Sequence, residues 1–238
     1  KMLSYKKSMI KDNTKGIEYL FKKNKITLIN GWASFIDKNT IRVDNKNYAA
    51  NYFVIATGSE ATSLKNIEFD EKVIVSSTGA LELEKIPEKM IIVGAGVIGL
   101  EMGSIYSRLG TEVTVLEFFD KVLNGMDHDI SKNFKSILQK QGFKFHLNCS
   151  VSMIAKEKKG VNVTFEQVGS KDQNQLSTNV VLVATGRKPF TKNLKLENIG
   201  VVLNPKGQIE TDSNWRTIAT NIFAIGDVTS GPMLAHKA

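Results

Sequence analysis

Hydrophobic residues along this chain follow two alternating patterns, short continuous runs and a helical spacing of three to four positions. Continuous runs at Met90–Val93 and Val180–Ala184 are typical of strands that are buried on both faces. Apolar residues at helical spacing predict helices over Leu100–Leu109 and Asp127–Lys140, each followed by a glycine that ends it. Because strands and helices alternate, the sequence predicts an α/β fold with a doubly wound, Rossmann-type parallel sheet and right-handed crossovers.

The two ends of the chain show weaker patterns. The first 24 residues carry apolar side chains at helical spacing, which predicts a helix. We expect the apolar stripe of this helix to be buried, and it consists of Met9, Ile10, Ile17, Leu20 and Phe21. Further strands are predicted at Ile26–Phe35 and Thr40–Val43, which form a β meander, and at Tyr52–Ala56, Phe143–Leu147, Val151–Ala155, Val161–Phe165 and Asn221–Val228.

The strand at Met90–Val93 runs directly into the loop Gly94-Ala95-Gly96-Val97-Ile98-Gly99 and then into a helix. In such a loop Gly94 allows the tight turn, Gly96 lets the backbone approach a pyrophosphate, and Gly99 lets helix and strand pack closely. The phosphates would bind the free N–H groups at the helix N-terminus. A second strand ends at Glu117, where a carboxylate can accept a hydrogen bond from a ribose 2′-OH. A purely structural glycine turn is the alternative, but the full order of strand, loop, helix, strand and acid favours a dinucleotide site.

Glu117 also bears on which dinucleotide is bound. A ribose 2′-phosphate would be repelled by this carboxylate and would require a nearby arginine. The residues that follow are Phe118, Phe119 and Asp120, and Lys121 is the only cation close by in the sequence. The sequence therefore favours NAD over NADP.

Composition excludes several function classes. The 238 residues are 42% hydrophobic and 24% charged, which is ordinary for a soluble globular protein of one large domain or two small ones. No run approaches the roughly 18 to 20 apolar residues that span a bilayer. The net charge of +8 comes from lysines that are spread along the chain, and the longest basic cluster, Lys156–Lys159, is typical of a solvated hairpin end. A nucleic-acid partner is not expected, because no basic stripe is interleaved with stacking aromatics.

The single cysteine and the three histidines point to no further chemistry. Cys149 follows a predicted strand and is expected to be a buried, inert thiol, and one cysteine excludes an internal disulfide. His128, His146 and His236 are scattered and lack metal-ligand spacing, so no metal site is expected.

Two strand ends share the sequence Ala-Thr-Gly, at Ala56–Gly58 and Ala184–Gly186, with the glycine loop between them and Gly226-Asp227 after them. This order resembles the flavoprotein pyridine-nucleotide disulfide oxidoreductases. Within that family the chain is most similar to the branch whose members oxidise protein-bound dihydrolipoyl groups. The likeness extends over almost the whole chain and is carried by Val75–Ala80, Pro87–Gly103, Gln139–Phe145, Gly186–Leu194, Ala224–Asp227 and Met233–Lys237.

The resemblance implies that the chain contributes to binding FAD as well as NAD. The implied NAD positions are Gly94, Ala95, Gly96, Val97, Ile98, Gly99, Glu101, Glu117, Val151 and Gly186, with Glu101 at the nicotinamide–flavin contact. The implied FAD positions are Gly31 near the adenine, Thr57, Gly58 and Ser59 in a turn, Asp227 at the sugar-alcohol region, and Met233, Leu234, Ala235 and His236 in a loop and helix start beneath the flavin. Glu101 could instead be an exposed helix acid with an ion-pair partner, and Asp227 a turn residue. Arg187 is more typical of a loop-ordering or ion-pairing residue than of a catalytic one.

Three features of the family have no counterpart in these 238 residues: its first FAD glycine loop, its redox-active Cys-x4-Cys, and its C-terminal dimerisation domain with a His–Glu pair. We therefore expect the chain to be the central part of a longer enzyme. The expected division is a partial FAD-binding domain over residues 1–62, an NAD-binding domain over 63–186 and a return segment to the FAD domain over 187–238. No catalytic residue is expected in the chain, and by itself it is expected to be inactive.

The resemblance implies a function for the intact enzyme. It would oxidise dihydrolipoamide on the lipoyl domain of a 2-oxoacid dehydrogenase complex and reduce NAD⁺ to NADH. It would act as a homodimer in the mitochondrial matrix or, in a bacterium, in the cytoplasm. The alternatives are another NAD(P)H-dependent disulfide reductase or an NADH oxidase of the same build, and a nucleotide-binding module without chemistry of its own.

Overall fold

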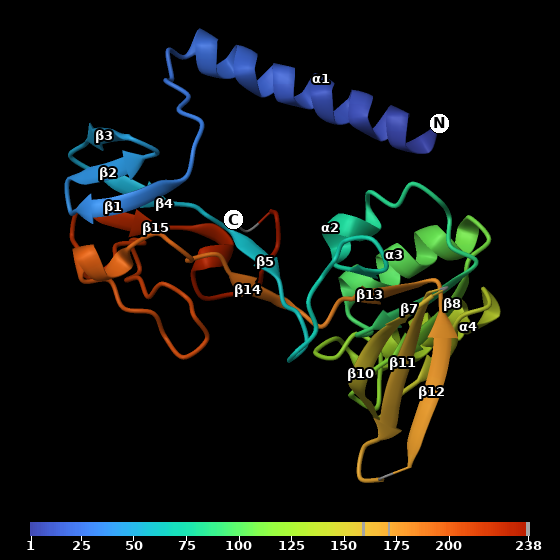
Figure 1. Cartoon of the computed structure of the whole chain (residues 1–238). Coiled ribbons are helices and arrows are strands. Elements are labelled where there is room, and N and C mark those ends of the chain that lie inside the picture. Colours follow the sequence, from blue (N-terminus) through green and yellow to red (C-terminus); the bar gives the residue numbers. More distant parts are fainter. Residues whose placement is uncertain (159, 171, 237–238) are drawn as a thin grey trace. The chain divides into compact units, whose positions relative to one another are not determined.

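Residues 1–158, 160–170 and 172–236 are described by a computed structural model of the chain (Figure 1). The chain divides into a continuous unit, residues 61–186, and a discontinuous unit formed by residues 1–60 and 187–238. The sequence had placed the first limit two residues later, after residue 62. Lys159 of the basic cluster and residues 237 and 238 of the return segment lie outside the described residues.

A parallel sheet of five strands forms the centre of the continuous unit. All four pairings in this sheet are parallel. The spatial order of its strands is β6 (Ile74–Val75), β13 (Val180–Val183), β7 (Lys89–Val93), β8 (Glu112–Leu116) and β9 (Lys144–His146). The late strand β13 therefore lies between β6 and β7, which confirms the predicted crossover topology and α/β fold.

The two faces of this sheet contact different layers, because successive side chains of a strand point to opposite faces. On β7, Met90 and Ile92 pack with Leu100 of α3 (Val97–Arg108) and Leu138 of α4 (His128–Lys140). Helices α3 and α4 therefore cover the first face of the sheet (Figure 1). The short helix α2 (Ser77–Ala80) contributes the buried Ala80 to the same cluster.

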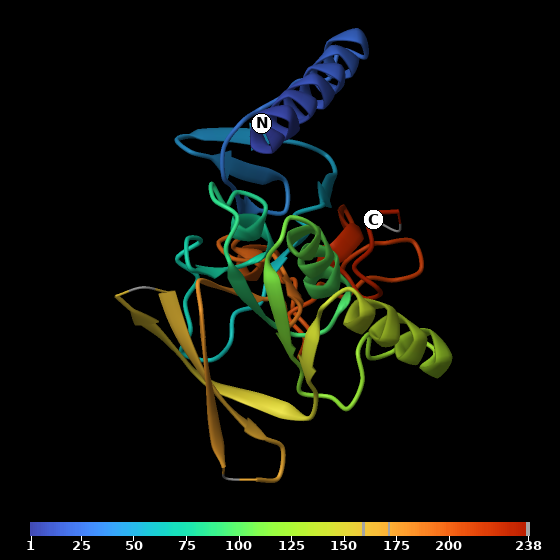
Figure 2. The same cartoon turned by 90° about the vertical axis from the view of Figure 1, so that its right-hand side faces the viewer.

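The second face of the parallel sheet is covered by another sheet and not by helices. Ile91 and Val93 of β7 pack against Val163 and Phe165 of β11. Figure 2 shows this antiparallel sheet across the parallel sheet from α3 and α4, and it consists of β10 (Cys149–Glu157), β11 (Gly160–Gln167) and β12 (Gln173–Thr178). Each fully buried side chain of β7 contributes about 1.5–3 kcal/mol, so both layers stabilise the strand that leads into the glycine loop.

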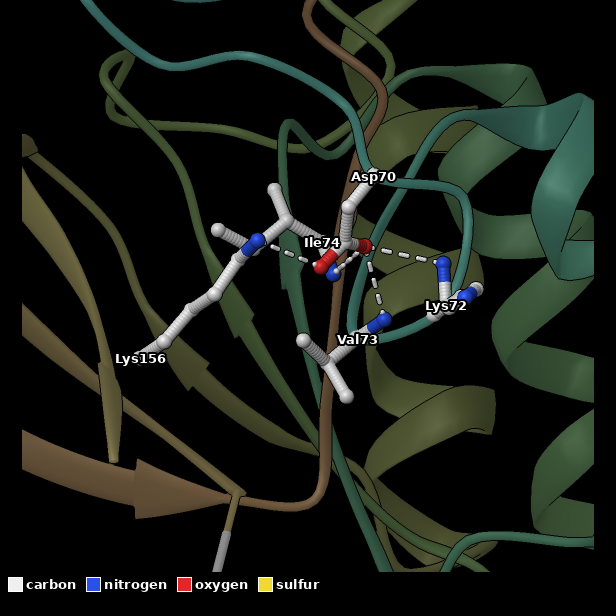
Figure 3. A network of polar contacts seen from close by, with 5 residues as sticks. All are labelled: Asp70, Lys72, Val73, Ile74 and Lys156. Atoms are coloured by element: carbon white, nitrogen blue, oxygen red, sulfur yellow. Dashed lines mark hydrogen bonds and ion pairs between the residues drawn. The ribbon is translucent and has the colours of Figure 1, made fainter. Parts of the chain in front are cut away.

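Asp70 links the entry to the parallel sheet with the antiparallel sheet (Figure 3). Its Oδ1 accepts hydrogen bonds from the backbone N–H groups of Lys72, Val73 and Ile74 at 2.8–2.9 Å. Its Oδ2 lies 2.8 Å from Nζ of Lys156 on β10. Burial by itself raises the pKa of Asp70, but the Lys156 ammonium and the three N–H donors lower it more, so the pKa lies well below its ordinary value of 3.8.

We expect the Asp70→Asn variant to lose about 1–2 kcal/mol of stability at pH 7, because the charge-assisted contacts of the carboxylate are removed. A carboxyl whose folded-state pKa is lowered stabilises the fold above its unfolded pKa, and this contribution fades as the pH falls below 3.8. Urea unfolding at pH 7 and at pH 3 checks this, with the exposed Asp120→Asn as control. A difference between parent and variant that is as large at pH 3 as at pH 7 would contradict it.

The discontinuous unit is built on a pair of parallel strands, β4 (Phe53–Ile55) and β15 (Ile222–Ala224). Ile55, Ile222 and Ala224 are buried together with Phe35 and the 3₁₀ helix Leu196–Ile199. Three further segments complete it: the antiparallel meander β1 (Ala33–Asp37), β2 (Thr40–Val43) and β3 (Lys46–Ala49), the paired strands β5 (Ser59–Ala61) and β14 (Arg187–Pro189), and the 3₁₀ turn η2 (Gly226–Val228).

Two expectations for the beginning of the chain are wrong. The predicted helix is present as α1 (Met2–Lys23), but none of its residues is buried, because no other described segment covers its apolar stripe. The first predicted strand begins at Ala33 and not at Ile26. Ile26, Leu28 and Ile29 are exposed and pair with no strand in the described chain, so the apolar run does not enter the meander. No described helix is long and apolar enough to cross a membrane.

Candidate nucleotide-binding sites

Three of the predicted NAD-binding residues lie at or just beyond the carboxyl ends of parallel strands. Gly94 follows β7, Glu117 follows β8, and Gly186 comes three residues after the end of β13. The strands are in register at these ends, since Val93 pairs with Leu116 of β8 and with Val183 of β13. The structure therefore brings these residues to the carboxyl edge of the sheet, where nucleotide ligands bind in open α/β folds.

The glycine loop places Gly94 and Gly96 in different surroundings. Gly94 has a φ of +103°, and a Cβ built there would lie 2.5 Å from the carbonyl oxygen of Ala184. Gly96 has an ordinary φ of −78° and precedes the first residue of α3, and a Cβ on it would meet nothing within 4 Å. Gly94 is thus required by the fold, whereas Gly96 leaves open space at the N-terminus of a 12-residue helix.

That open space suits a pyrophosphate. The first N–H groups of a helix have no partner within it, and here they belong to Val97, Ile98 and Gly99. Together with the helix dipole, these donors favour an anion. The residues present therefore fit the phosphates of a dinucleotide.

Glu117 is 8% exposed and is bound to the glycine loop. Its Oε2 accepts a hydrogen bond from the N–H of Ala95 at 2.5 Å, and its Oε1 accepts one from the N–H of Phe119 at 2.9 Å. A carboxylate has about four lone-pair positions, so both oxygens can still accept a ribose hydroxyl. The sequence had predicted a ribose contact but not that Glu117 also anchors the loop.

Glu101 and Val151 lie outside this hydrogen-bonded group. Glu101 is exposed on α3 and lines a cavity of about 480 Å³ with Val97 and Arg108. It forms no ion pair with any described residue, so the alternative of a paired helix acid gains no support. Val151 is half-buried at the beginning of β10, against the core of the second face. Both remain predictions as NAD contacts.

In the discontinuous unit a cavity of about 610 Å³ gathers three of the predicted FAD positions, Gly31, Thr57 and Ser59. The hydroxyl of Thr57 donates a hydrogen bond to the carbonyl oxygen of Phe190 at 2.6 Å, and the N–H of Phe190 donates one to the carbonyl oxygen of Gly58 at 2.9 Å. The segment Thr57–Ser59, which enters β5, is thereby fixed against the segment that follows β14. The residues present fit one end of an elongated ligand that carries a flat ring.

The wall of this cavity contains residues that the sequence analysis did not select. Trp32 is 76% exposed, and its ring centroid lies 5.8 Å from that of Phe190. Lys192 supplies a cation to the same cavity. The position of Trp32 directly after Gly31 was a signal for it, whereas Phe190 and Lys192 are more than 130 residues away in the sequence and gave none.

Asp227 joins this group through Ser59. The hydroxyl of Ser59 donates to Oδ2 of Asp227 at 2.7 Å. Arg187 donates from Nε to the Ser59 hydroxyl oxygen at 2.7 Å and from Nη2 to the Ser59 carbonyl oxygen at 2.6 Å. The alternative was that Asp227 is only a turn residue. The backbone does turn at Gly226, which has a φ of +74°, but a turn alone does not account for the side-chain contact of Asp227 with Ser59.

The predicted FAD positions at the end of the chain are not brought to this group by any described contact. Met233 is half-buried, and Leu234, Ala235 and His236 are exposed. Ala235 and His236 form a turn, and a helix that starts there would continue into residues 237 and 238, which lie outside the described residues.

Cys149 is buried and its thiol donates to the carbonyl oxygen of His146 at 3.2 Å. Burial raises the pKa of this thiol, which keeps it protonated at neutral pH. Within the described part of the chain, no group of three or more His, Cys, Asp or Glu side chains gathers to hold a metal ion.

Comparison with known proteins gives one consistent family. Residues 3–238 match the sequence profile of the family described as pyridine nucleotide-disulphide oxidoreductase. The chain is 47% identical to the mitochondrial dihydrolipoyl dehydrogenases of Homo sapiens and of Rattus norvegicus, over its full length and 48% of theirs. It thus spans about half the length of the curated relatives it matches. Among solved structures it is similar to the flavoprotein disulfide reductase RclA from Escherichia coli, with 32% identity and a TM-score of 0.81 over 95% of this chain and 53% of that one.

Proposed function

Because the chain belongs to the pyridine nucleotide-disulphide oxidoreductase family, we propose that it forms the NAD-binding portion and part of the FAD-binding portion of a dihydrolipoyl dehydrogenase. In the whole protein, a dihydrolipoyl group would be oxidised to the cyclic disulfide, NAD⁺ would be reduced to NADH, and one proton would be released. The substrate would be the lipoyl domain of a 2-oxoacid dehydrogenase complex. We place the enzyme in the mitochondrial matrix because its relatives are named mitochondrial. The homodimer is proposed from the family resemblance alone.

The observation that carries the NAD proposal is the placement of the Glu117 carboxylate. It is held within the glycine loop by the N–H of Ala95, next to the helix N-terminus that suits phosphates. The N–H groups of Val97, Ile98 and Gly99 would bind the pyrophosphate, and Glu117 would accept the ribose 2′-OH. A 2′-phosphate at the same place would face the buried Glu117 carboxylate, so these residues favour NAD over NADP.

For FAD, the proposal is supported by the cavity that Gly31, Thr57 and Ser59 line, and by the link from Ser59 to Asp227. A bound flavin supplies the electron transfer between a dithiol and the nicotinamide. The residues of this chain would bind and orient the flavin cofactor. Gly31 would allow the cofactor to approach the backbone closely, and Asp227 would accept hydrogen bonds from its hydroxyl groups. Since the chain holds one cysteine and its thiol is buried, we infer that these 238 residues alone do not oxidise dithiols.

Isothermal titration of the chain with NADH and with NADPH, at one fixed salt concentration, tests the NAD proposal. We expect NADH to bind at least tenfold more tightly than NADPH, because the carboxylate repels the extra phosphate. ADP-ribose is the control, and it should bind like NADH because the discriminating contact is at the adenosine ribose. Equal affinities for NADH and NADPH, or no binding of either to the folded chain, would refute the proposal.

A second candidate is favoured by the likeness to RclA, which is named a flavoprotein disulfide reductase. In that case the same sites would hold the cofactors, and a different disulfide would be the substrate. Turnover of dihydrolipoamide by the longest natural protein that contains these 238 residues separates the two candidates. A nucleotide-binding module without chemistry of its own would bind NADH at the glycine loop, but it would turn over neither dihydrolipoamide nor another disulfide substrate.

A further inference from the structure

The contacts of Ser59 in the discontinuous unit have a fixed direction. Arginine has only donors, so the Nε–H of Arg187 occupies a lone pair of the Ser59 hydroxyl oxygen. The hydrogen of that hydroxyl is then directed to Oδ2 of Asp227, which can only accept. The second donor of Arg187 holds the Ser59 carbonyl oxygen, so the guanidinium grips Ser59 at two points.

This arrangement leaves one side of Asp227 available. Oδ2 is held by Ser59, whereas Oδ1 receives no hydrogen bond from any described residue. Asp227 is half-buried, which limits how its carboxylate can turn away from a ligand. Ser59 itself lines the cavity of about 610 Å³. Asp227 is therefore joined to the lining of that cavity through the Ser59 hydroxyl, with its Oδ1 left to accept a hydrogen bond from a ligand.

We propose that Arg187 is a positioning residue that orients Ser59, and through it the Asp227 carboxylate, toward the hydroxyl groups of the sugar-alcohol chain of a bound flavin. The inference rests on the proposed function, because it requires a flavin at this site. It gives Arg187 a role at a distance from the ligand. Removal of the guanidinium frees the Ser59 hydroxyl to rotate, and Asp227 then loses the donor that fixes its orientation.

The proposal predicts which ligands respond to Arg187. Riboflavin carries the sugar-alcohol chain without adenine, ADP carries adenine without that chain, and FAD carries both. In Arg187→Met we expect riboflavin and FAD to bind at least tenfold more weakly and ADP to bind within twofold of the parent. A purely structural role would weaken all three ligands together.

The variants are compared in the longest natural protein that contains these residues, stripped of flavin and titrated by fluorescence quenching and calorimetry. Lys188→Met is the matched control, since it removes the neighbouring cation, whose ion pair with Glu60 at 3.2 Å is exposed. It should bind all three ligands like the parent. Ser59→Ala should reproduce the Arg187→Met pattern, and the double variant should lose no more than either single one, because both act through one hydrogen bond.

Thermal unfolding shows whether each variant is folded. If Arg187→Met does not fold, Arg187→Lys and Ser59→Ala carry the comparison, and Arg187→Lys should show an intermediate loss because one ammonium cannot hold both oxygens of Ser59. Unchanged flavin affinity in the folded variants, or an equal loss for ADP and flavins, overturns the role of Arg187. A parent that binds ADP but neither riboflavin nor FAD overturns the proposed FAD site instead, and the inference with it.

Discussion

Replacement of Gly94 by alanine is expected to destabilise the continuous unit by about 3 kcal/mol. The φ of +103° at Gly94 is strained for any other residue, and the new methyl group would lie 2.5 Å from the carbonyl oxygen of Ala184. Relief of this contact would require β7 and β13 to separate at the ends where Val93 and Val183 pair. Urea unfolding followed by circular dichroism measures the loss.

Gly96→Ala is the matched control, two positions away in the same loop. Its φ of −78° suits alanine, and its Cβ would point into open space, so the unfolding free energy should change by no more than about 0.5 kcal/mol. Its NADH affinity should nevertheless fall about tenfold, because the methyl group occupies space that the pyrophosphate needs. If Gly94→Ala is as stable as the parent, or if Gly96→Ala binds NADH normally, the division of roles between these glycines is wrong.

Glu117→Ala is expected to lose about 3 kcal/mol of stability as well as the preference for NADH over NADPH. Two N–H groups, of Ala95 and Phe119, would lose a charged acceptor at a site where Glu117 is 8% exposed. Each such loss costs about 1–3 kcal/mol. Alanine therefore tests both roles of Glu117 at once and cannot separate them.

Glu117→Gln separates them, because its side chain keeps the shape and one acceptor oxygen for the loop. We expect it to remain folded with a loss of about 1 kcal/mol and to bind NADPH nearly as well as NADH, since the repelling charge is gone. Asp120→Ala, three residues further on and exposed, should match the parent in both measurements. A folded Glu117→Gln variant with an unchanged NADH preference would leave Glu117 with the structural role alone.

The parts of the fold that the sequence predicted are those in which local pattern and packing agree. The apolar run of β7 and the glycines after it determine strand, turn and helix within about 15 residues. Strand β12 was missed because most of its side chains are polar and exposed, and only Leu176 and Thr178 turn inward. Strand β3, with Lys46 and Asn47, was missed for the same reason. A strand of this kind is stabilised by its hydrogen-bonded neighbour, which periodicity does not reveal.

The candidate sites divide in the same way. The glycine loop and Glu117 lie within one strand–helix–strand segment, so spacing alone selected them. The contacts of Ser59 with Arg187 and with Asp227 join residues 128 and 168 positions apart, and no local pattern connects them. For α1 the sequence predicted burial that the structure does not show. Helical spacing indicates which side chains lie on one face, but it does not reveal whether another segment covers that face.

The insertion of the continuous unit between the two halves of the other unit sets an order for folding during synthesis. Residues 61–186 include every strand of the parallel sheet, so this unit can close without any strand of the other unit. Strand β4 must wait, because Phe53 pairs with Ile222, which is made after the continuous unit. During that interval β4 has no partner among the described strands, and its unpaired backbone groups are open to association with other chains. A chaperone that binds the nascent chain should therefore contact the segment that contains β4 until Ile222 has been made.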